Sequence, residues 1–214
     1  MKTYLCLDHT HSSSLPPEFA DDDVRYPESL VRRFLEQHTQ PGDLVFDPFA
    51  GFGTTLVAAE ALGRAGYGVE IDPDKLDYAR SRLQHPERLL HGDARRLLEY
   101  PLPTFAFSMT SPPFMTRDEI DDPLSDYREK GRGYRAYLDE LRGVYAQLRQ
   151  RMQPAGIVVV EVANLKIGGL LTPLAWDVAE QISRVLHFEG EVVVCWDRYG
   201  YGYDHSYCLV FSVL

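Results

Sequence analysis

A glycine-rich turn contains the first residues whose types and spacing suit a chemical task. Its sequence is Asp-Pro-Phe-Ala-Gly-Phe-Gly-Thr-Thr, with Asp47 at the end of a short apolar stretch and Gly51 and Gly53 two positions apart. Glycines at such a turn let a ligand approach the backbone closely, because they have no Cβ atom. Glu70 ends the next apolar stretch, 19 positions after Gly51, where a carboxylate accepts hydrogen bonds from a ribose diol. The pattern favours an adenosine site over a purely structural turn.

The residues beside the glycines indicate which nucleotide the turn would bind. The third glycine of a dinucleotide turn is missing, and Asp47 would repel a pyrophosphate group. A nicotinamide dehydrogenase is therefore disfavoured, whereas S-adenosylmethionine carries a sulfonium and an ammonium group that an acidic residue attracts. Asp93, at the end of a third short apolar stretch, is suited to the adenine amino group.

A second motif, Ser-Pro-Pro-Phe at 111–114, follows a later apolar stretch. Two successive prolines stiffen the turn and remove two backbone donors, which leaves nearby carbonyl groups as acceptors. The Ser111 hydroxyl and the Pro112 carbonyl would each accept one N–H of an exocyclic amine, and Phe114 would stack on the base. An ordinary Ser-Pro-Pro turn is the alternative, but the preceding glycine-rich motif favours the amine site.

Together, the two motifs resemble those of the DNA amino-methyltransferases, the group that methylates N4 of cytosine or N6 of adenine. The resemblance extends from Tyr26 to the C-terminus and implies S-adenosylmethionine as cofactor and a nucleic acid, DNA or RNA, as substrate. Serine in the first position of the second motif is more often associated with N4 of cytosine. The residues that we expect at the cofactor are Tyr26, Pro27, Asp47, Phe49, Ala50, Gly51, Gly53, Thr54, Thr55, Glu70, Ile71, Asp93 and Ala94. Those expected at the reacting amine are Ser111, Pro112, Pro113 and Phe114.

The sequence departs from the pattern of that family at three points. Phe52 stands where the family usually has a small residue, and the cofactor motif precedes the catalytic one. No segment is long enough for a separate target-recognition domain, so the resemblance is to a catalytic domain alone. A small enzyme acting on structured RNA is the nearest alternative, and a protein glutamine methyltransferase or a non-catalytic cofactor-binding module is a more distant one. A protein partner for target selection would fit this size, and the oligomeric state is left open.

Two segments are candidates for substrate binding. The segment after the second motif holds a basic cluster, Arg128, Lys130 and Arg132, which could contact phosphates or pair with the acidic residues around it. A glycine-spaced aromatic loop near the C-terminus contains Tyr199 and Tyr201, which could stack on bases or pack on a sheet edge.

Composition limits the classes of protein to consider. The chain of 214 residues is 44% hydrophobic and 25% charged, which suits one globular domain and excludes a disordered or collagen-like chain. Its formal net charge of −10 argues against broad electrostatic binding to nucleic acid or membranes. Three widely spaced cysteines suggest a reducing compartment and no structural metal, and no apolar stretch is long enough to span a bilayer. We therefore expect a cytoplasmic protein without a membrane partner.

The elements that position these residues alternate along the chain. Apolar patterns predict strands at 43–46, 66–71, 88–90, 105–110, 157–162, 192–196 and 208–213, and helices at 27–40, 54–62, 74–83, 134–152 and 173–186. Such alternation predicts an α/β fold with a doubly wound, mainly parallel sheet, and the last two strands, which have no helix between them, predict an antiparallel hairpin. The resemblance makes this a class I methyltransferase fold, which is Rossmann-like, with seven strands. We expect an irregular arm at 1–25 and the methyltransferase domain at 26–214.

Overall fold

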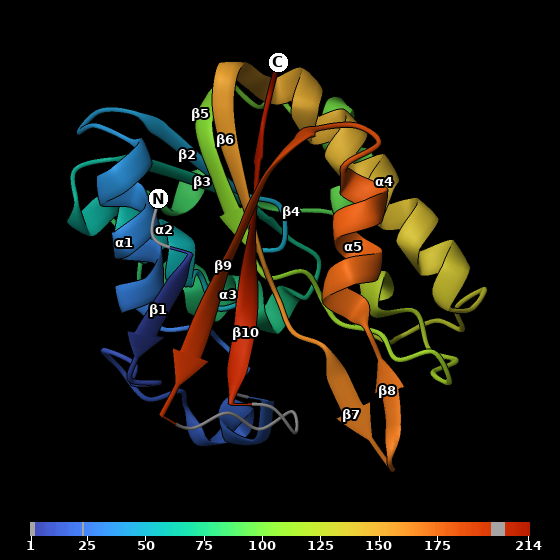
Figure 1. Cartoon of the computed structure of the whole chain (residues 1–214). Helices are drawn as coiled ribbons and strands as arrows, with labels where there is room; N and C mark the ends of the chain where they lie inside the picture. The colour runs from blue at the N-terminus through green and yellow to red at the C-terminus, as the bar shows by residue number, and fades with distance from the viewer. Residues whose placement is uncertain (1–2, 23, 198–203) are drawn as a thin grey trace.

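The computed structural model describes residues 3–22, 24–197 and 204–214, and shows helices packed on a central sheet (Figure 1). The α-helices are α1 (Glu28–His38), α2 (Thr54–Ala61), α3 (Pro73–Ser81), α4 (Tyr134–Arg151) and α5 (Leu174–Ile182). The strands are β1 (Tyr4–Leu7), β2 (Leu44–Asp47), β3 (Ala65–Glu70), β4 (Leu89–His91), β5 (Phe105–Thr110), β6 (Met152–Val162), β7 (Leu165–Ile167), β8 (Leu170–Thr172), β9 (His187–Trp196) and β10 (His205–Ser212). Short 3-10 helices are η1 (Pro17–Asp22), η2 (Pro86–Arg88), η3 (Ala94–Glu99) and η4 (Pro123–Ser125).

The main sheet has eight strands in the order β1-β9-β10-β6-β5-β2-β3-β4. Among these described strands, only β10 runs against its neighbours, since it pairs antiparallel with both β6 and β9 while the other pairs are parallel. The α/β class, the mainly parallel sheet and the C-terminal hairpin of β9 and β10 are thus confirmed. The chain goes from β2 to β3 and β4 on one side and then returns to β5 on the other, which makes the boundary between β2 and β5 a topological switch point.

The sheet has eight strands, where the sequence pattern predicts seven, because β1 adds to its edge. β1 lies within the stretch 1–25 that we expected to be irregular, and it pairs parallel to β9, with Tyr4 opposite Val193 and Leu7 opposite Trp196. Its sequence, Tyr-Leu-Cys-Leu, is a run of four apolar residues with no polar alternation, and its side chains alternate between exposed and half-buried positions. β7 and β8 form a separate antiparallel hairpin that projects from the body of the molecule beside α5 (Figure 1).

Apolar packing covers both faces of the sheet. On one face, α4 and α5 bury Leu141, Tyr145 and Val178 against the sheet. On the other face, α1 and α2 pack Leu30 and Ala58 against it. The apolar residues of α1, α4 and α5 recur at helical spacing and form a stripe on each of these helices, and burial of the stripes holds the strand ends in the positions from which the site is built.

The turn from β2 into α2 depends on its glycines. Gly51 and Gly53 have φ angles of 51° and 81°, in the left-handed region that favours glycine. A Cβ atom on Gly53 would also lie 3.1 Å from the Cβ of Ala79, which is fully buried on α3. This turn therefore brings the start of α2 and the middle of α3 closer together than a side chain would allow.

None of the helices in the described ranges combines the length and the apolar character that a bilayer-crossing helix requires. Likewise, no group of three or more His, Cys, Asp or Glu side chains within those ranges is arranged to hold a metal ion.

Candidate active site

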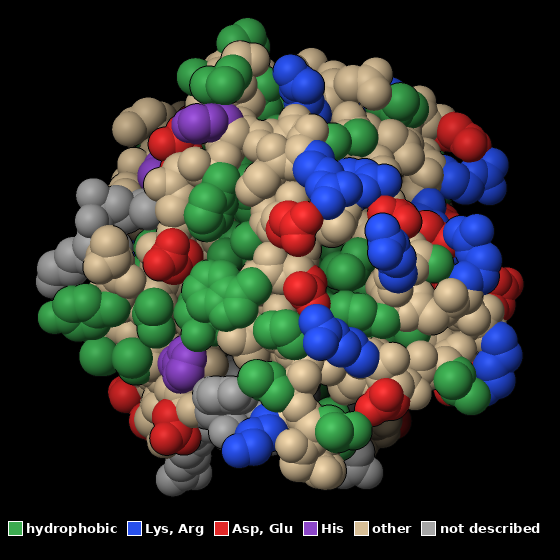
Figure 2. All heavy atoms as spheres, turned by 45° about the vertical axis from the view of Figure 1, so that its right-hand side comes forward, with side chains coloured by type: hydrophobic (Ala, Val, Ile, Leu, Met, Phe, Trp, Pro, Cys, Tyr) green, Lys and Arg blue, Asp and Glu red, His purple; other side chains and the backbone are tan. Residues whose placement is uncertain are grey.

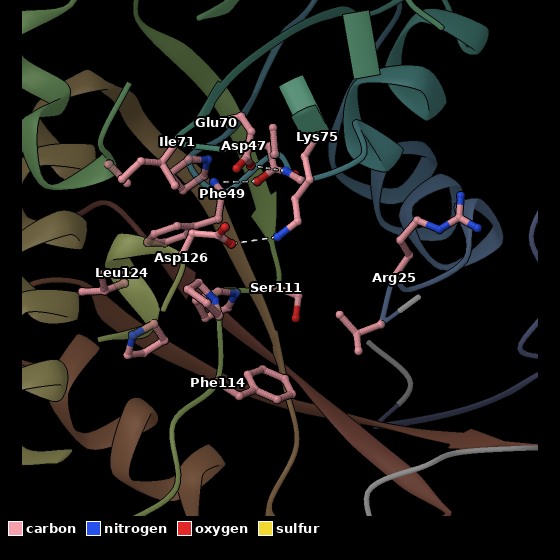
Figure 3. A pocket seen from close by; sticks show the side chains of 18 of the residues that line it. Arg25, Asp47, Phe49, Glu70, Ile71, Lys75, Ser111, Phe114, Leu124 and Asp126 are labelled. Carbon is pink, nitrogen blue, oxygen red and sulfur yellow. Dashed lines mark hydrogen bonds and ion pairs between the residues drawn. The ribbon is translucent and has the colours of Figure 1, made fainter. Parts of the chain in front are cut away.

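The carboxyl ends of β2, β3, β5 and β6 open onto a cavity of about 570 Å³ at the switch point. Figure 3 shows Glu70 and Ile71 toward one end of this cavity and Phe114 toward the other, with Ser111 between them. The cavity therefore brings together two motifs that are some 60 positions apart in the sequence. The expected site residues that line it are Tyr26, Asp47, Phe49, Ala50, Gly51, Thr54, Glu70, Ile71, Ala94, Ser111, Pro112, Pro113 and Phe114.

Asp47, the last residue of β2, is a buried carboxylate at the floor of the cavity. Its Oδ1 accepts the Phe49 N–H at 3.0 Å, and its Oδ2 lies 3.5 Å from the hydroxyl of Tyr26, which also contacts Thr55. Burial raises the pKa of Asp47 to about 6, although these hydrogen bonds oppose the shift. A cation bound in the cavity would relieve the cost of this buried charge.

Glu70, the last residue of β3, connects two of the loops that surround the cavity. Its Oε2 accepts the Gly51 N–H at 2.6 Å and its Oε1 accepts the Asp72 N–H at 2.8 Å. Burial is the largest influence on the carboxyl group and raises its pKa. Each carboxylate oxygen has a second lone pair, so both oxygens keep an acceptor for a ligand hydroxyl.

The second motif follows β5, and two of the carbonyl groups in this motif already accept hydrogen bonds from the protein. Tyr137 donates its hydroxyl to the Pro113 carbonyl at 2.9 Å, and Tyr127 donates to the Phe114 carbonyl at 2.7 Å. Within the described residues, no hydrogen bond reaches the Pro112 carbonyl. The arrangement thus leaves the Ser111 hydroxyl and the Pro112 carbonyl as the two acceptors that we expected for an amine.

Other expected cofactor residues lie outside the cavity wall. Pro27 precedes α1, Gly53 is the residue before α2, and Thr55 contacts the Tyr26 hydroxyl. Asp93 caps η3, and its carboxylate pairs with Arg95 at 2.8 Å, so its side chain is engaged away from the cavity lining. Its role toward an adenine amino group stays a prediction.

The basic cluster is paired with carboxylates. Arg128 contacts Asp72 at 2.7 Å, Lys130 contacts Asp121 at 2.5 Å, and Arg132 contacts Glu140. Figure 2 shows that Lys and Arg side chains are interspersed with Asp and Glu side chains on the displayed face. Phosphate contact by the cluster therefore requires these pairs to open. Tyr199 and Tyr201 lie outside the described residues.

The cavity also contains residues that the motifs did not indicate. Lys75 of α3 reaches across it to Asp126, with 2.8 Å between Nζ and Oδ1 (Figure 3). Phe52, where the family pattern has a small residue, packs against Phe19 of η1 at a ring distance of 5.2 Å. Glu161 of β6 is a buried lining residue, and the signal that could have identified it is one acidic residue in an otherwise apolar strand.

The overall structure is similar to those of known methyltransferases. A TehB-like SAM-dependent methyltransferase from Corynebacterium glutamicum matches 92% of this chain and 93% of its own, at 16% identity and a TM-score of 0.59. A putative class I S-adenosylmethionine-dependent methyltransferase from Listeria monocytogenes matches 87% of this chain and 58% of its own, at 18% identity and a TM-score of 0.61. The chain therefore has the class I methyltransferase fold, as the resemblance implied.

Sequence comparison shows, over part of the chain, which group of methyltransferases the chain is similar to. Residues 9–81 match the family model of the N6/N4 DNA methylases. Type II methyltransferase M.BglII from Bacillus subtilis is 44% identical over 56 residues, and type II methyltransferase M2.DpnII from Streptococcus pneumoniae is 43% identical over 58 residues. These matches cover 26% and 27% of this chain, and 16% and 22% of the two relatives. The resemblance to the DNA amino-methyltransferases is thus confirmed over residues 9–81, which include the glycine-rich motif.

Proposed function

We propose that this chain is an S-adenosylmethionine-dependent methyltransferase that acts on an exocyclic amino group of a nucleobase, with N4 of cytosine in DNA as the first candidate and N6 of adenine as the second. The observation that carries the proposal is the single cavity shared by Asp47, Glu70 and the Ser-Pro-Pro-Phe turn. The family-model match and the curated relatives support a DNA substrate.

The residues of the cavity fit this cofactor. A buried carboxylate with a raised pKa suits a ligand that carries positive charge, and Asp47 has both properties. Glu70 offers acceptors to a ribose diol at the end of β3. When bound, the cofactor would supply an electrophilic methyl group on a sulfonium, which is already a good leaving group.

The turn that follows β5 would prepare the amine. The Ser111 hydroxyl and the Pro112 carbonyl accept its two N–H groups, and this draws the nitrogen lone pair out of conjugation with the ring. Phe114 packs against the apolar core on one side and lines the cavity on the other, so it holds a fixed surface on which a base stacks. Positioning and desolvation of this kind account for most of the rate that such a transfer requires.

Methyl transfer to defined substrates tests the proposal. Cofactor labelled in its methyl group is incubated with duplex DNA, single-stranded DNA, ribosomal RNA and transfer RNA, and the modified nucleoside is identified by mass spectrometry. We expect a methylated amino group in DNA. Ser111→Ala is the control, because it should lower turnover while largely sparing cofactor affinity. Methylation confined to RNA would show that the substrate is RNA and not DNA. Methylation at a carbon or a hydroxyl group would refute the proposed role of Ser111.

A further inference from the structure

The β7–β8 hairpin carries exposed apolar side chains at the edge of the candidate active site. It projects from the body of the molecule beside α5 (Figure 1). Ile167, Leu170 and Leu171 are 59%, 64% and 51% exposed. A single exposed leucine needs no explanation, but a group of large apolar side chains on one projecting element marks a binding surface. Neither sequence motif predicts this surface.

The pairing of the two strands divides the side chains of the hairpin between two faces, because successive side chains of a strand point to opposite sides. Leu165 and Ile167 therefore share one face, and both line the cavity. Leu165 is 3% exposed, so this face is buried at its base and becomes exposed toward the tip. The apolar wall of the cavity thus continues outward along the hairpin. The cross-strand pairs are Leu165 with Thr172, Lys166 with Leu171, and Ile167 with Leu170.

The hairpin is narrow at its tip and attached at its base to the turn that would hold the amine. The tip is Gly168-Gly169, whose φ angles of 58° and 82° suit the tight two-residue turn that joins antiparallel strands. At the base, the Thr172 hydroxyl accepts the Arg117 N–H at 3.1 Å. Arg117 lies three residues after Phe114, so this hydrogen bond fixes the hairpin relative to the Ser-Pro-Pro-Phe turn.

We propose that the β7–β8 hairpin enters duplex DNA beside the target base, where Ile167 and Leu170 fill the space in the base stack that the target base leaves. The inference rests on the proposed function, because an amino group inside a duplex reaches Ser111 only when its base turns out of the helix. Turning the base out exposes the faces of its neighbours to water. Apolar side chains inserted between base steps cover such faces, and the hairpin presents two of them at the rim of the cavity.

Shape and charge favour DNA over a second copy of the chain as the occupant of this surface. A two-stranded β-ribbon is narrow enough to enter the major groove. Lys166, on the face opposite Ile167, is exposed and forms no ion pair among the described residues, so its ammonium group is available to a phosphate. The exposed area of three apolar side chains is well below the roughly 800 Å² per partner that a stable protein interface buries. A second copy on the tip would also cover the rim of the cavity.

The test compares two neighbouring leucines on opposite faces of the hairpin. Leu170→Ala removes a side chain from the face that continues the cavity wall, and Leu171→Ala is the matched control. Each variant is assayed for methyl transfer to duplex DNA and to the same DNA in single-stranded form. On duplex DNA, we expect kcat/KM to fall by about tenfold for Leu170→Ala, and further for Ile167→Ala/Leu170→Ala. On single-stranded DNA, where no stack has to be refilled, both should stay within about threefold of wild type.

The control variant should stay within about threefold of wild type on both forms of DNA. Because these side chains are exposed, all variants should keep the Tm and the cofactor affinity of wild type, measured by calorimetry. Photo-crosslinking to duplex DNA that contains bromodeoxyuridine gives a readout independent of methyl transfer. We expect crosslinked peptides from residues 165–172 of the wild type, and fewer of them from Ile167→Ala/Leu170→Ala.

The outcomes separate this inference from the function on which it rests. Equal losses for Leu170→Ala and Leu171→Ala, or equal losses on duplex and single-stranded DNA, would overturn the inference and leave the proposed function in place. A wild-type dimer that Ile167→Ala/Leu170→Ala converts to a monomer in sedimentation would also overturn it, because the tip would then join two copies. If wild type methylates no nucleic acid, the proposed function fails. Crosslinks at 165–172 would then still support the contact with the duplex, and their absence would overturn it as well.

Discussion

Asp47 couples the stability of the free protein to pH. Its folded-state pKa of about 6 lies above the usual aspartate value, so the folded protein retains a proton that the unfolded chain loses between about pH 4 and pH 6. Stability therefore declines as pH rises through this window, and above it the cost stays near 3 kcal/mol, from roughly 1.4 kcal/mol per pKa unit.

Asp47→Asn should remove this cost. Without cofactor, urea unfolding should show the variant to be more stable than wild type by up to about 3 kcal/mol at pH 7.5 and by only about 1 kcal/mol at pH 4.5. Asp77→Asn, which removes an exposed carboxylate from α3, is the control and should show no such pH-dependent gain. An equal difference at both pH values would mean that Asp47 is not a buried charge.

The same carboxylate should make cofactor binding depend on pH. A cationic ligand favours the ionised form, so affinity should fall once Asp47 is protonated, by up to about tenfold per pH unit below pH 6. Calorimetry with S-adenosylmethionine between pH 5 and 8 checks this, and the Asp47→Asn variant should bind weakly with little pH dependence. Unchanged affinity in that variant would refute the cofactor assignment.

The residues of the site differ in how far sequence alone could place them. Asp47, Glu70 and Ser111 were predictable, because each ends or follows an apolar strand and parallel strands end at one edge. Glu161 was not, because only the pairing of β6 with β5 and β10 brings it to the cavity that Ser111 also lines. The pairing of Asp93 with Arg95, two residues away, likewise depends on the local geometry of η3.

At the level of elements, the close packing of α2 on α3 depends on the absence of a side chain at Gly53. Gly53→Ala should destabilise the fold by about 2 to 3 kcal/mol, because it combines a left-handed backbone with a Cβ 3.1 Å from the buried Ala79. Gly63→Ala is a matched control: its φ of 73° is similar, but the nearest atom to its Cβ lies 3.8 Å away. Urea unfolding should place its destabilisation near 1 kcal/mol, and equal effects for both variants would refute the role of packing at Gly53.

Elements with a strong apolar period were the predictable ones. α4 runs from Tyr134 to Arg151, where its stripe predicts 134–152, and β5 matches its predicted range. β7 and β8 are three residues each and pair only with each other among the described strands, so they are too short to show an alternating pattern. β1 is an apolar run of only four residues, Tyr-Leu-Cys-Leu, and such a short run at a half-exposed sheet edge is an ambiguous signal. The pairing of β1 with the distant strand β9 is not encoded in the local sequence.

At the scale of the whole molecule, an acidic protein needs a local cationic surface to hold a polyanion. Lys130 and Arg132 are 71% and 77% exposed in their ion pairs, and exposed pairs contribute at most about 1 kcal/mol. Phosphate groups can therefore compete with the carboxylates for these cations. The ion pairs seen in the structure do not rule out phosphate binding by the predicted basic cluster.

Replacing Arg128, Lys130 and Arg132 together by Gln should weaken DNA binding most at low salt. The slope of log affinity against log salt concentration should become shallower by about 0.9 for each phosphate that the variant no longer neutralises. Arg184→Gln is the control, since Arg184 pairs with Glu180 at the C-terminal end of α5 and does not line the cavity. Fluorescence anisotropy between about 50 and 200 mM salt measures the slopes, and an unchanged slope in the triple variant would exclude the cluster from binding.

The identity of the methylated product decides whether this chain is an amino-methyltransferase of DNA. Wild-type protein, labelled S-adenosylmethionine and DNA are incubated together, and the digested nucleosides are separated and identified by mass spectrometry. We predict N4-methylcytosine, or N6-methyladenine as the second candidate, at a level that Ser111→Ala reduces strongly while cofactor affinity is kept. Label on a ring carbon, or equal product from the Ser111→Ala variant, would contradict the proposed function.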